Sequence, residues 1–214
     1  MDATTNKQML SEDNIRSLLR SQNSTASSLQ VRTNEKLLAK CPTPSALLER
    51  WNPSLQATAA SKVIADLSLN RDIPALVDVK TTYGEQTAYQ WLLVQLLSLN
   101  NYTGVNNGMT DAQVSELAYL ILSNYYYLNL AEIMQFIAKF KLGIYGQFYG
   151  SVDPLKITSA LQTYIRQRNL SIEDAENYRK RKERERQAEE NRKNAVTYEE
   201  YLQIKQNDIR RNQS

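Results

Sequence analysis

Residues 130–168 constrain the fold more than any other part of this chain. They contain two apolar patterns with helical spacing, separated by the segment GIYGQFYG at residues 143–150. Asn129 and Glu132 have the spacing of a capping box before the first pattern, and Asp153 followed by proline is typical of the start of the second helix. The stretch therefore predicts two helices joined by a turn rich in glycine and aromatic residues.

The rest of the chain favours helices as well. Six glycines and five prolines in 214 residues disfavour a turn-rich β fold. Further helices are predicted before Pro53 and over residues 55–69, 85–100 and 110–124. The 85–100 segment is apolar nearly all round, which predicts a buried helix. Val63 is expected to face inward. We expect an all-α fold with three parts, namely a flexible polar arm over residues 1–35, a helical core domain over 36–170 and a charged helical tail over 171–214.

The tail carries the excess positive charge of the chain. The first 165 residues contain 13 cations and 13 anions, whereas residues 166–193 contain ten cations and seven anions. Ser171 and Asp174 have capping-box spacing, which predicts a new helix start. Interspersed charges of both signs are typical of a solvated, salt-bridged helix. The alternative is phosphate contact by the cluster Arg179, Lys180, Arg181 and Lys182.

The composition argues against an enzyme. The chain has no histidine and one cysteine, Cys41, so it cannot form a Cys–His or Ser–His–Asp nucleophile or a thiolate metal cluster. We expect no catalytic residue, no cofactor and no metal site. The opening residues are polar, and no run approaches the ~20 apolar residues that span a bilayer, so we expect neither a signal peptide nor membrane insertion. The single cysteine fits a reducing compartment such as the cytoplasm.

The turn at residues 143–150 has two interpretations. Its aromatic residues can pack on the core, or they can stack on unpaired bases while nearby cations contact phosphate. In the second case the predicted nucleic-acid-binding residues of the core domain are Lys139, Lys141, Tyr145, Phe148, Tyr149, Lys156, Arg166 and Arg168. A helix-turn-helix reader is a weaker alternative, because the polar face of residues 154–168 carries only one lysine and two arginines.

A short amphipathic segment ends the tail. Thr197 and Glu200 have capping-box spacing. Tyr198, Tyr201 and Leu202 follow a charged linker and are the predicted partner-binding residues, since an amphipathic helix can dock in a groove of another protein. Docking on the core of the same chain is the alternative.

Several local patterns carry a resemblance to a family. They are MTDAQ at residues 109–113, YLNL at 127–130, the Phe136 to Gly150 segment with its YGQFYG turn, Asp153, and Tyr164 with Arg168. With these patterns, residues 83–200 resemble uncharacterised small helical proteins of phages and mobile elements in gut-type bacteria. The resemblance implies a bacterial or phage cytoplasm and an accessory role in DNA transactions.

These observations lead to two functional hypotheses. The first is a non-enzymatic accessory protein that binds DNA or RNA through the tail cations, or a replication protein, in the manner of a replisome organiser or helicase loader. The second is a protein-interaction adaptor or assembly factor that does not bind nucleic acid.

Overall fold

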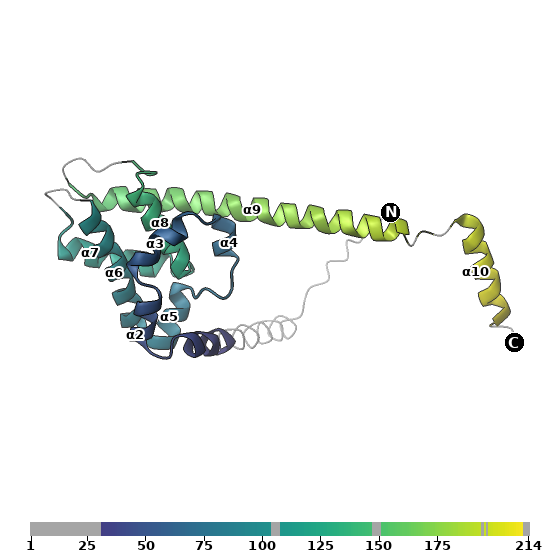
Figure 1. The fold of residues 1–214 in the computed structure, drawn as a ribbon, viewed down its shortest axis with the longest axis horizontal. Coiled ribbons are helices and arrows are strands. Elements are labelled where there is room, and N and C mark those ends of the chain that lie inside the picture. The colour runs from purple at the N-terminus through teal and green to yellow at the C-terminus, as the bar shows by residue number, and fades with distance from the viewer. Residues whose placement is uncertain (1–30, 104–107, 147–150, 194, 196, 212–214) are drawn as a thin grey trace, which may run out of the picture. The chain divides into compact units, whose positions relative to one another are not determined.

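The chain is all-α in the residues that the structure, a computed structural model, describes. These are residues 31–103, 108–146, 151–193, 195 and 197–211 (Figure 1). They contain no strand, and an isolated bridge joins Ala75 to Asn129. The chain divides into two compact units, Met1–Arg168 and Asn169–Ser214.

The first unit contains short helices followed by longer ones. Residues 31–40 are helical, including 31–35, which the sequence analysis assigned to a flexible arm. The following elements are α2 (Pro44–Arg50), the 3-10 helix η1 (Pro53–Leu55), α3 (Gln56–Ala60), α4 (Ile64–Ser68), α5 (Leu76–Tyr83), α6 (Glu85–Tyr102), α7 (Asp111–Asn124) and α8 (Leu130–Lys141). The long helix α9 (Pro154–Lys193) begins in this unit and continues into the second, which also contains α10 (Tyr198–Arg211).

The core is built around α6 and α8. Helix α8 packs on α3, α4 and α6, while α5 and α7 also pack on α6. The 85–100 segment is a helix as predicted, and Trp91, Leu92, Leu96 and Leu99 are buried, but Val94 is 41% exposed, so only one face of the helix lies in the core. Residues 130–138 of α8 are all buried, although the sequence predicted a single apolar face. Two capping boxes form as predicted, at the starts of α7 and α8.

The predicted helix over residues 55–69 is wrong in its continuity. It is divided into η1, α3 and α4, and Val63 is 59% exposed instead of facing inward. The side-chain amide of Gln135 explains the break, because it donates to the backbone carbonyls of Ala59 at 3.0 Å and Lys62 at 2.7 Å. These carbonyls at the end of α3 are thereby satisfied without a continuing helix.

The predicted helix start at Ser171 is also wrong. Helix α9 runs without interruption from Pro154 to Lys193, so Ser171 lies within it. Nothing in residues 168–171 breaks a helix, because this segment contains neither glycine nor proline. The capping-box spacing alone was therefore a false signal.

Candidate nucleic-acid interface

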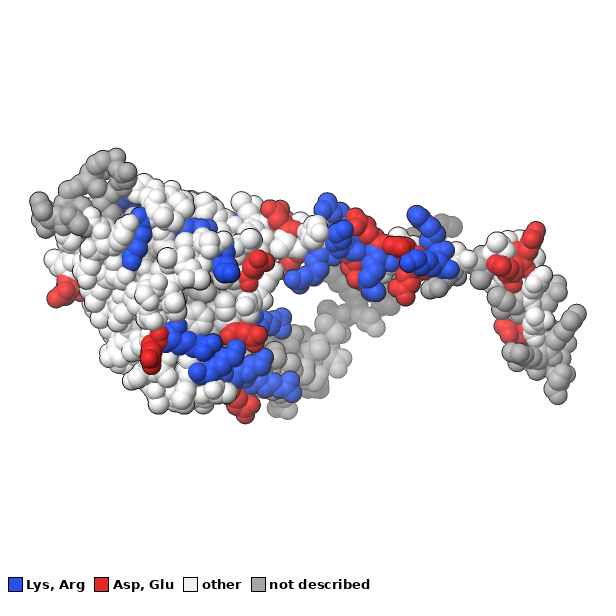
Figure 2. All heavy atoms as spheres, viewed as in Figure 1, with Lys and Arg blue, Asp and Glu red and all other residues white. Residues whose placement is uncertain are grey.

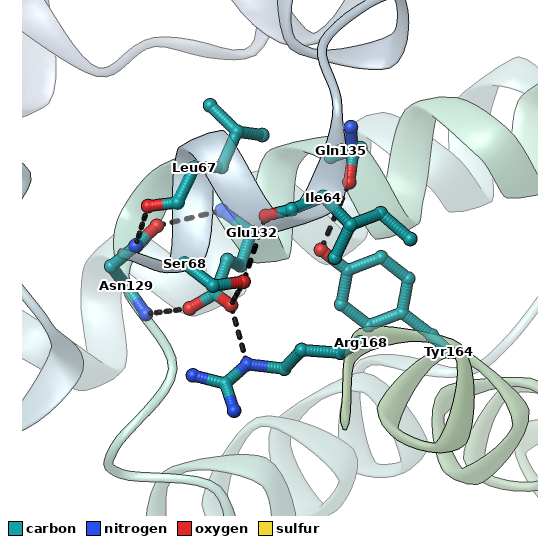
Figure 3. Close-up of polar contacts among 8 residues, drawn as sticks. All are labelled: Ile64, Leu67, Ser68, Asn129, Glu132, Gln135, Tyr164 and Arg168. Carbon is teal, nitrogen blue, oxygen red and sulfur yellow. Dashed lines mark hydrogen bonds and ion pairs between the residues drawn. The ribbon is translucent and has the colours of Figure 1, made fainter. Parts of the chain in front are cut away.

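Arg168, a predicted phosphate contact, lies in a polar network inside the first unit. Its Nε donates to Oε1 of Glu132 at 2.5 Å, and the two side chains are 16% and 1% exposed (Figure 3). Arg168 also lies over the ring of Tyr127 at 5.7 Å. Its charge is thus neutralised within the fold, and Arg168 is not a free phosphate ligand.

The carboxylate of Glu132 is satisfied on both oxygens. Oε2 accepts from the backbone N–H of Asn129 at 2.8 Å, and Oε1 accepts from the hydroxyl of Ser68 at 2.5 Å in addition to Arg168. Asn129 in turn donates from its side chain to the carbonyl of Leu67 at 2.8 Å (Figure 3). The capping box that begins α8 therefore also fixes α4 and α9. A buried carboxylate with this many partners is a structural element rather than a poised acid or base.

A second buried polar pair links α8 to α9. The hydroxyl of Tyr164 donates to Oε1 of Gln135 at 3.0 Å, and both residues are fully buried (Figure 3). Burial raises the pKa of Tyr164 well above its ordinary value. The amide nitrogen of Gln135 also donates to the carbonyls of Ala59 and Lys62 at the end of α3, so this one buried glutamine joins α8 to α3 and α9.

The two predicted lysines at the end of α8 are also engaged. Lys141 Nζ donates to Oε1 of Gln56 at 2.8 Å and to the hydroxyl of Ser98 at 2.7 Å. Lys139 lies over the ring of Tyr164 at 5.8 Å. Burial lowers the pKa of both lysines. Partial desolvation and internal partners make these two residues poor candidates for phosphate binding.

The aromatic turn packs inward where the structure describes it. The ring of Tyr145 contacts Phe136 and Phe140, with centroids 5.6 and 5.8 Å apart, and its buried hydroxyl has no hydrogen-bond partner among the described residues. Burial raises the pKa of Tyr145 to about 12. Phe148 and Tyr149 lie outside the described residues. Gly143, with φ of 76°, provides the left-handed turn after α8.

The remaining two predicted cations of this region are on α9. Arg166 is exposed, and its guanidinium donates to the hydroxyl of Thr163 at 2.9 Å. Lys156 is partly buried, and its Nζ lies beside Gly146, 3.7 Å from where a Cβ would stand. The predicted residues of the core domain therefore do not form one open basic surface.

The tail cations differ from those of the core domain, because the later part of α9 is exposed. All side chains from residue 176 to residue 193 are exposed. Four ion pairs form along it, and in Figure 2 both signs of charge are intermixed there. They join Lys182 to Glu185, Arg186 to Glu183 and Glu190, and Lys193 to Glu189. All four glutamates between Arg179 and Lys193 are therefore already paired.

The charges of this helix sort by face. At ~100° per residue, Lys180, Arg181 and Arg184 fall within about 100° of the helix circumference, together with Asn177, Ala188 and Asn191. The four glutamates between Arg179 and Lys193 and the cations paired with them lie on the rest of the surface. None of these three cations has a carboxylate partner among the described residues, and Arg181 lies over the ring of Tyr178 at 5.5 Å. We call Lys180, Arg181 and Arg184 the unpaired face.

Sequence reasoning included Lys180 and Arg181 among the candidates but missed Arg184. Arg184 could have been found by assigning the i,i+3 and i,i+4 ion pairs of the tail first and then projecting the remaining cations onto a helix. Of the other two predicted tail cations, Lys182 is paired with Glu185 at 3.5 Å, and Arg179 lies on the side of the paired charges.

Helix α10 presents the predicted partner-binding residues. Tyr198, Tyr201 and Leu202 are 74%, 50% and 38% exposed. Their i, i+3, i+4 spacing puts them on one face of the helix. The predicted capping box forms, with the backbone N–H of Thr197 donating to Glu200 at 2.8 Å and that of Glu200 donating to the Thr197 hydroxyl at 3.3 Å.

A basic cluster on the first unit was not predicted from the sequence. Lys36, Lys40, Arg50 and Arg71 line one small pocket with Asp72. Its sequence signal is weak, because the cations are spread over 36 positions and the first 165 residues as a whole have no net charge. The i,i+4 row of Arg32, Lys36 and Lys40 is the part that a helical projection would have found.

The described part of the chain has neither a metal-binding cluster nor a helix that could cross a membrane. No group of three potential Cys, Asp or Glu ligands is placed to hold a metal ion in this part of the chain. None of its helices combines the length and apolarity needed to cross a bilayer.

Comparison with known families gives one match. The model of DUF6633, a family of unknown function, matches residues 108–212, which is just under half of the chain. The matched range contains α7 to α10, and hence the unpaired face, while the basic cluster lies outside it. The second half of this chain is thus similar to an uncharacterised family, to which no activity is attached. No curated protein and no solved structure matches the chain.

Proposed function

We propose that this protein is a non-enzymatic accessory protein that binds nucleic acid through helix α9. The observation that carries the proposal is the unpaired face. The four carboxylates between Arg179 and Lys193 are used by Lys182, Arg186 and Lys193, whereas Lys180, Arg181 and Arg184 are exposed and without ion-pair partners in the described tail. Such a row of cations provides salt-sensitive affinity for phosphate that does not depend on base sequence.

The setting that we propose is the cytoplasm of a bacterium carrying a phage or mobile element, where the protein acts in DNA replication. A replisome organiser or helicase loader has to contact both a nucleic acid and a protein. The exposed apolar face of α10 supports the second contact, since Tyr198 and Tyr201 are the kind of residue that dominates protein interfaces. The resemblance to proteins of mobile elements supports the setting.

The test compares two variants that remove the same charge. Lys180→Ala/Arg181→Ala/Arg184→Ala changes the unpaired face, and Lys182→Ala/Arg186→Ala/Lys193→Ala changes cations that already have carboxylate partners. Binding of a fluorescein-labelled single-stranded oligonucleotide is measured by anisotropy over a series of salt concentrations. We expect the first variant to lower the slope of log K against log salt by about 2, at ~0.7 per lost phosphate contact, and the second to lower it by less.

Two results would contradict the proposal. One is the absence of binding by the unaltered protein at low salt, with double-stranded DNA and RNA as well as with the single strand. The other is an equal loss in the two variants, which would mean that net charge and not the unpaired face determines the binding.

An adaptor that does not bind nucleic acid is the second candidate function, and α10 favours it. A photo-crosslinking residue in place of Glu199, next to the apolar face, reports on a bound protein. The adaptor role predicts a crosslinked partner that disappears on Tyr198→Ser/Tyr201→Ser/Leu202→Ser, while the variants of the unpaired face have no effect. A crosslink that persists in the triple serine variant would remove this candidate.

A further inference from the structure

The first unit carries a compact basic site that is separate in the chain from α9. Four cations from three segments line its pocket: Lys36 and Lys40 from the helix at residues 31–40, Arg50 from the end of α2, and Arg71 from the loop after α4. In Figure 2, blue atoms gather over the part of the molecule where Figure 1 has the helix at residues 31–40. This convergence is notable because the first 165 residues have no net charge.

The positive charge of this site is poorly compensated. Its one lining carboxylate, Asp72, lies 3.6 Å from the Lys36 ammonium and 4.0 Å from that of Lys40, and Arg50 and Arg71 have no ion-pair partner among the described residues. Arg32, Lys36 and Lys40 also follow one another at i,i+4 spacing, an arrangement of like charges that weakens a helix. A bound anion would relieve this repulsion.

The size of the pocket restricts what the anion can be. Its volume is about 40 Å³. This is more than one water molecule requires and far less than the ~300–1,000 Å³ of a typical cofactor or drug-sized ligand site. A single phosphate group fits this scale. The two arginines that line the pocket suit a phosphate, because a guanidinium group can bind it with paired hydrogen bonds.

Two of the residues that line the pocket are buried and neutral. Leu37 and Cys41 are buried there, at 5% and 1% exposure. Burial raises the pKa of the Cys41 thiol, which keeps it protonated at neutral pH. The pocket therefore contains no negative group besides Asp72 that would oppose an anion.

We propose that Lys36, Lys40, Arg50 and Arg71 bind a phosphate group of a nucleic-acid strand, as a contact additional to that of α9. The nucleic acid as the source of the phosphate rests on the proposed function, whereas the phosphate site itself does not. Free phosphate or pyrophosphate is the other source with the same chemistry.

The experiment uses the full chain and three variants. Lys36→Ala/Arg71→Ala changes the site, Lys62→Ala/Lys80→Ala removes two exposed charges elsewhere on the same unit, and Lys36→Gln/Arg71→Gln repeats the first change with longer side chains if the alanine variant is unfolded by circular dichroism. Each is titrated with the labelled single strand over a salt series, alone and combined with the variant of the unpaired face. Pyrophosphate is titrated separately by calorimetry.

We expect the site variant to lower the salt slope by about 1.4, which corresponds to two phosphate contacts at ~0.7 each, and the control to leave it unchanged. The loss should persist when the unpaired face is already altered. If the site variant equals its control while α9 still matters, the inference is overturned and the proposed function stands. If the protein binds no nucleic acid, pyrophosphate decides: binding that the site variant abolishes upholds the phosphate site, and no binding overturns it.

Discussion

Helix α9 contains arginines in two very different surroundings. Arg168 is held by the buried carboxylate of Glu132 and the ring of Tyr127, while Arg181 is exposed and has only the ring of Tyr178 beside it. Both belong to the same uninterrupted helix, and both were equal candidates for phosphate contact in the sequence. The difference shows that cations of this protein serve either the fold or the surface, depending on whether partners inside the fold reach them.

The largest effect is expected at Glu132. In Glu132→Ala, Arg168 loses its counter-charge, and Ser68 and the N–H of Asn129 lose an acceptor. Removal of one partner of a buried ion pair costs about 3–5 kcal/mol, so the free energy of unfolding should fall by that amount. Urea denaturation followed by circular dichroism measures it. Glu189→Ala, which removes an exposed partner of Lys193, is the matched control and should change it by less than about 1 kcal/mol.

A smaller loss of stability is expected at the buried pair of Tyr164 and Gln135. Tyr164→Phe keeps the ring in place but removes the hydroxyl that donates to Gln135. The buried Oε1 of Gln135 is then without its donor, which costs about 1–3 kcal/mol. The free energy of unfolding at pH 7 measures the loss. An unchanged value would mean that this hydrogen bond does not join α8 to α9.

The same substitution at Tyr145 should have the opposite effect on stability. Its buried hydroxyl has no partner among the described residues, so Tyr145→Phe removes a desolvated polar group and should raise the free energy of unfolding by up to about 1 kcal/mol. A loss of stability on this change would show that the hydroxyl has a hydrogen-bond partner and would contradict this prediction.

The pH dependence of stability should also differ between the wild-type protein and Tyr145→Phe. Because burial raises the pKa of Tyr145 from 10 to about 12, the unfolded chain ionises first. The wild-type protein therefore loses the contribution of this group as the pH rises from about 10 to 12, and the phenylalanine variant does not. The stability difference between the two proteins should widen over this interval in denaturation curves, and a constant difference would be contrary to it.

Much of the helical framework was predictable, because local signals agree with the fold. The capping boxes at Thr110 and Asn129 and the apolar pattern of residues 85–100 gave three helices close to their observed limits. The break between α3 and α4 was not predictable, since it depends on Gln135, more than 70 residues away in the sequence. Helix α5 was missed altogether.

The candidate site was predictable only in part, for a similar reason. Composition located the exposed cations of the tail, but long-range contacts decided that Arg168 and Lys141 serve the fold. Conversely, the cluster of Lys36, Lys40, Arg50 and Arg71 forms only when separate segments meet in the folded unit. Total charge over a segment conceals such a local excess.

The contrast between the two arginines of α9 is tested most directly by one measurement. Urea denaturation is carried out on Arg168→Ala and Arg181→Ala under identical conditions. We predict that Arg168→Ala lowers the free energy of unfolding by about 3–5 kcal/mol, because Glu132 is left buried without its partner, and that Arg181→Ala changes it by less than about 0.5 kcal/mol. Equal effects of the two substitutions would contradict the division of α9 into a structural part and a part available for phosphate.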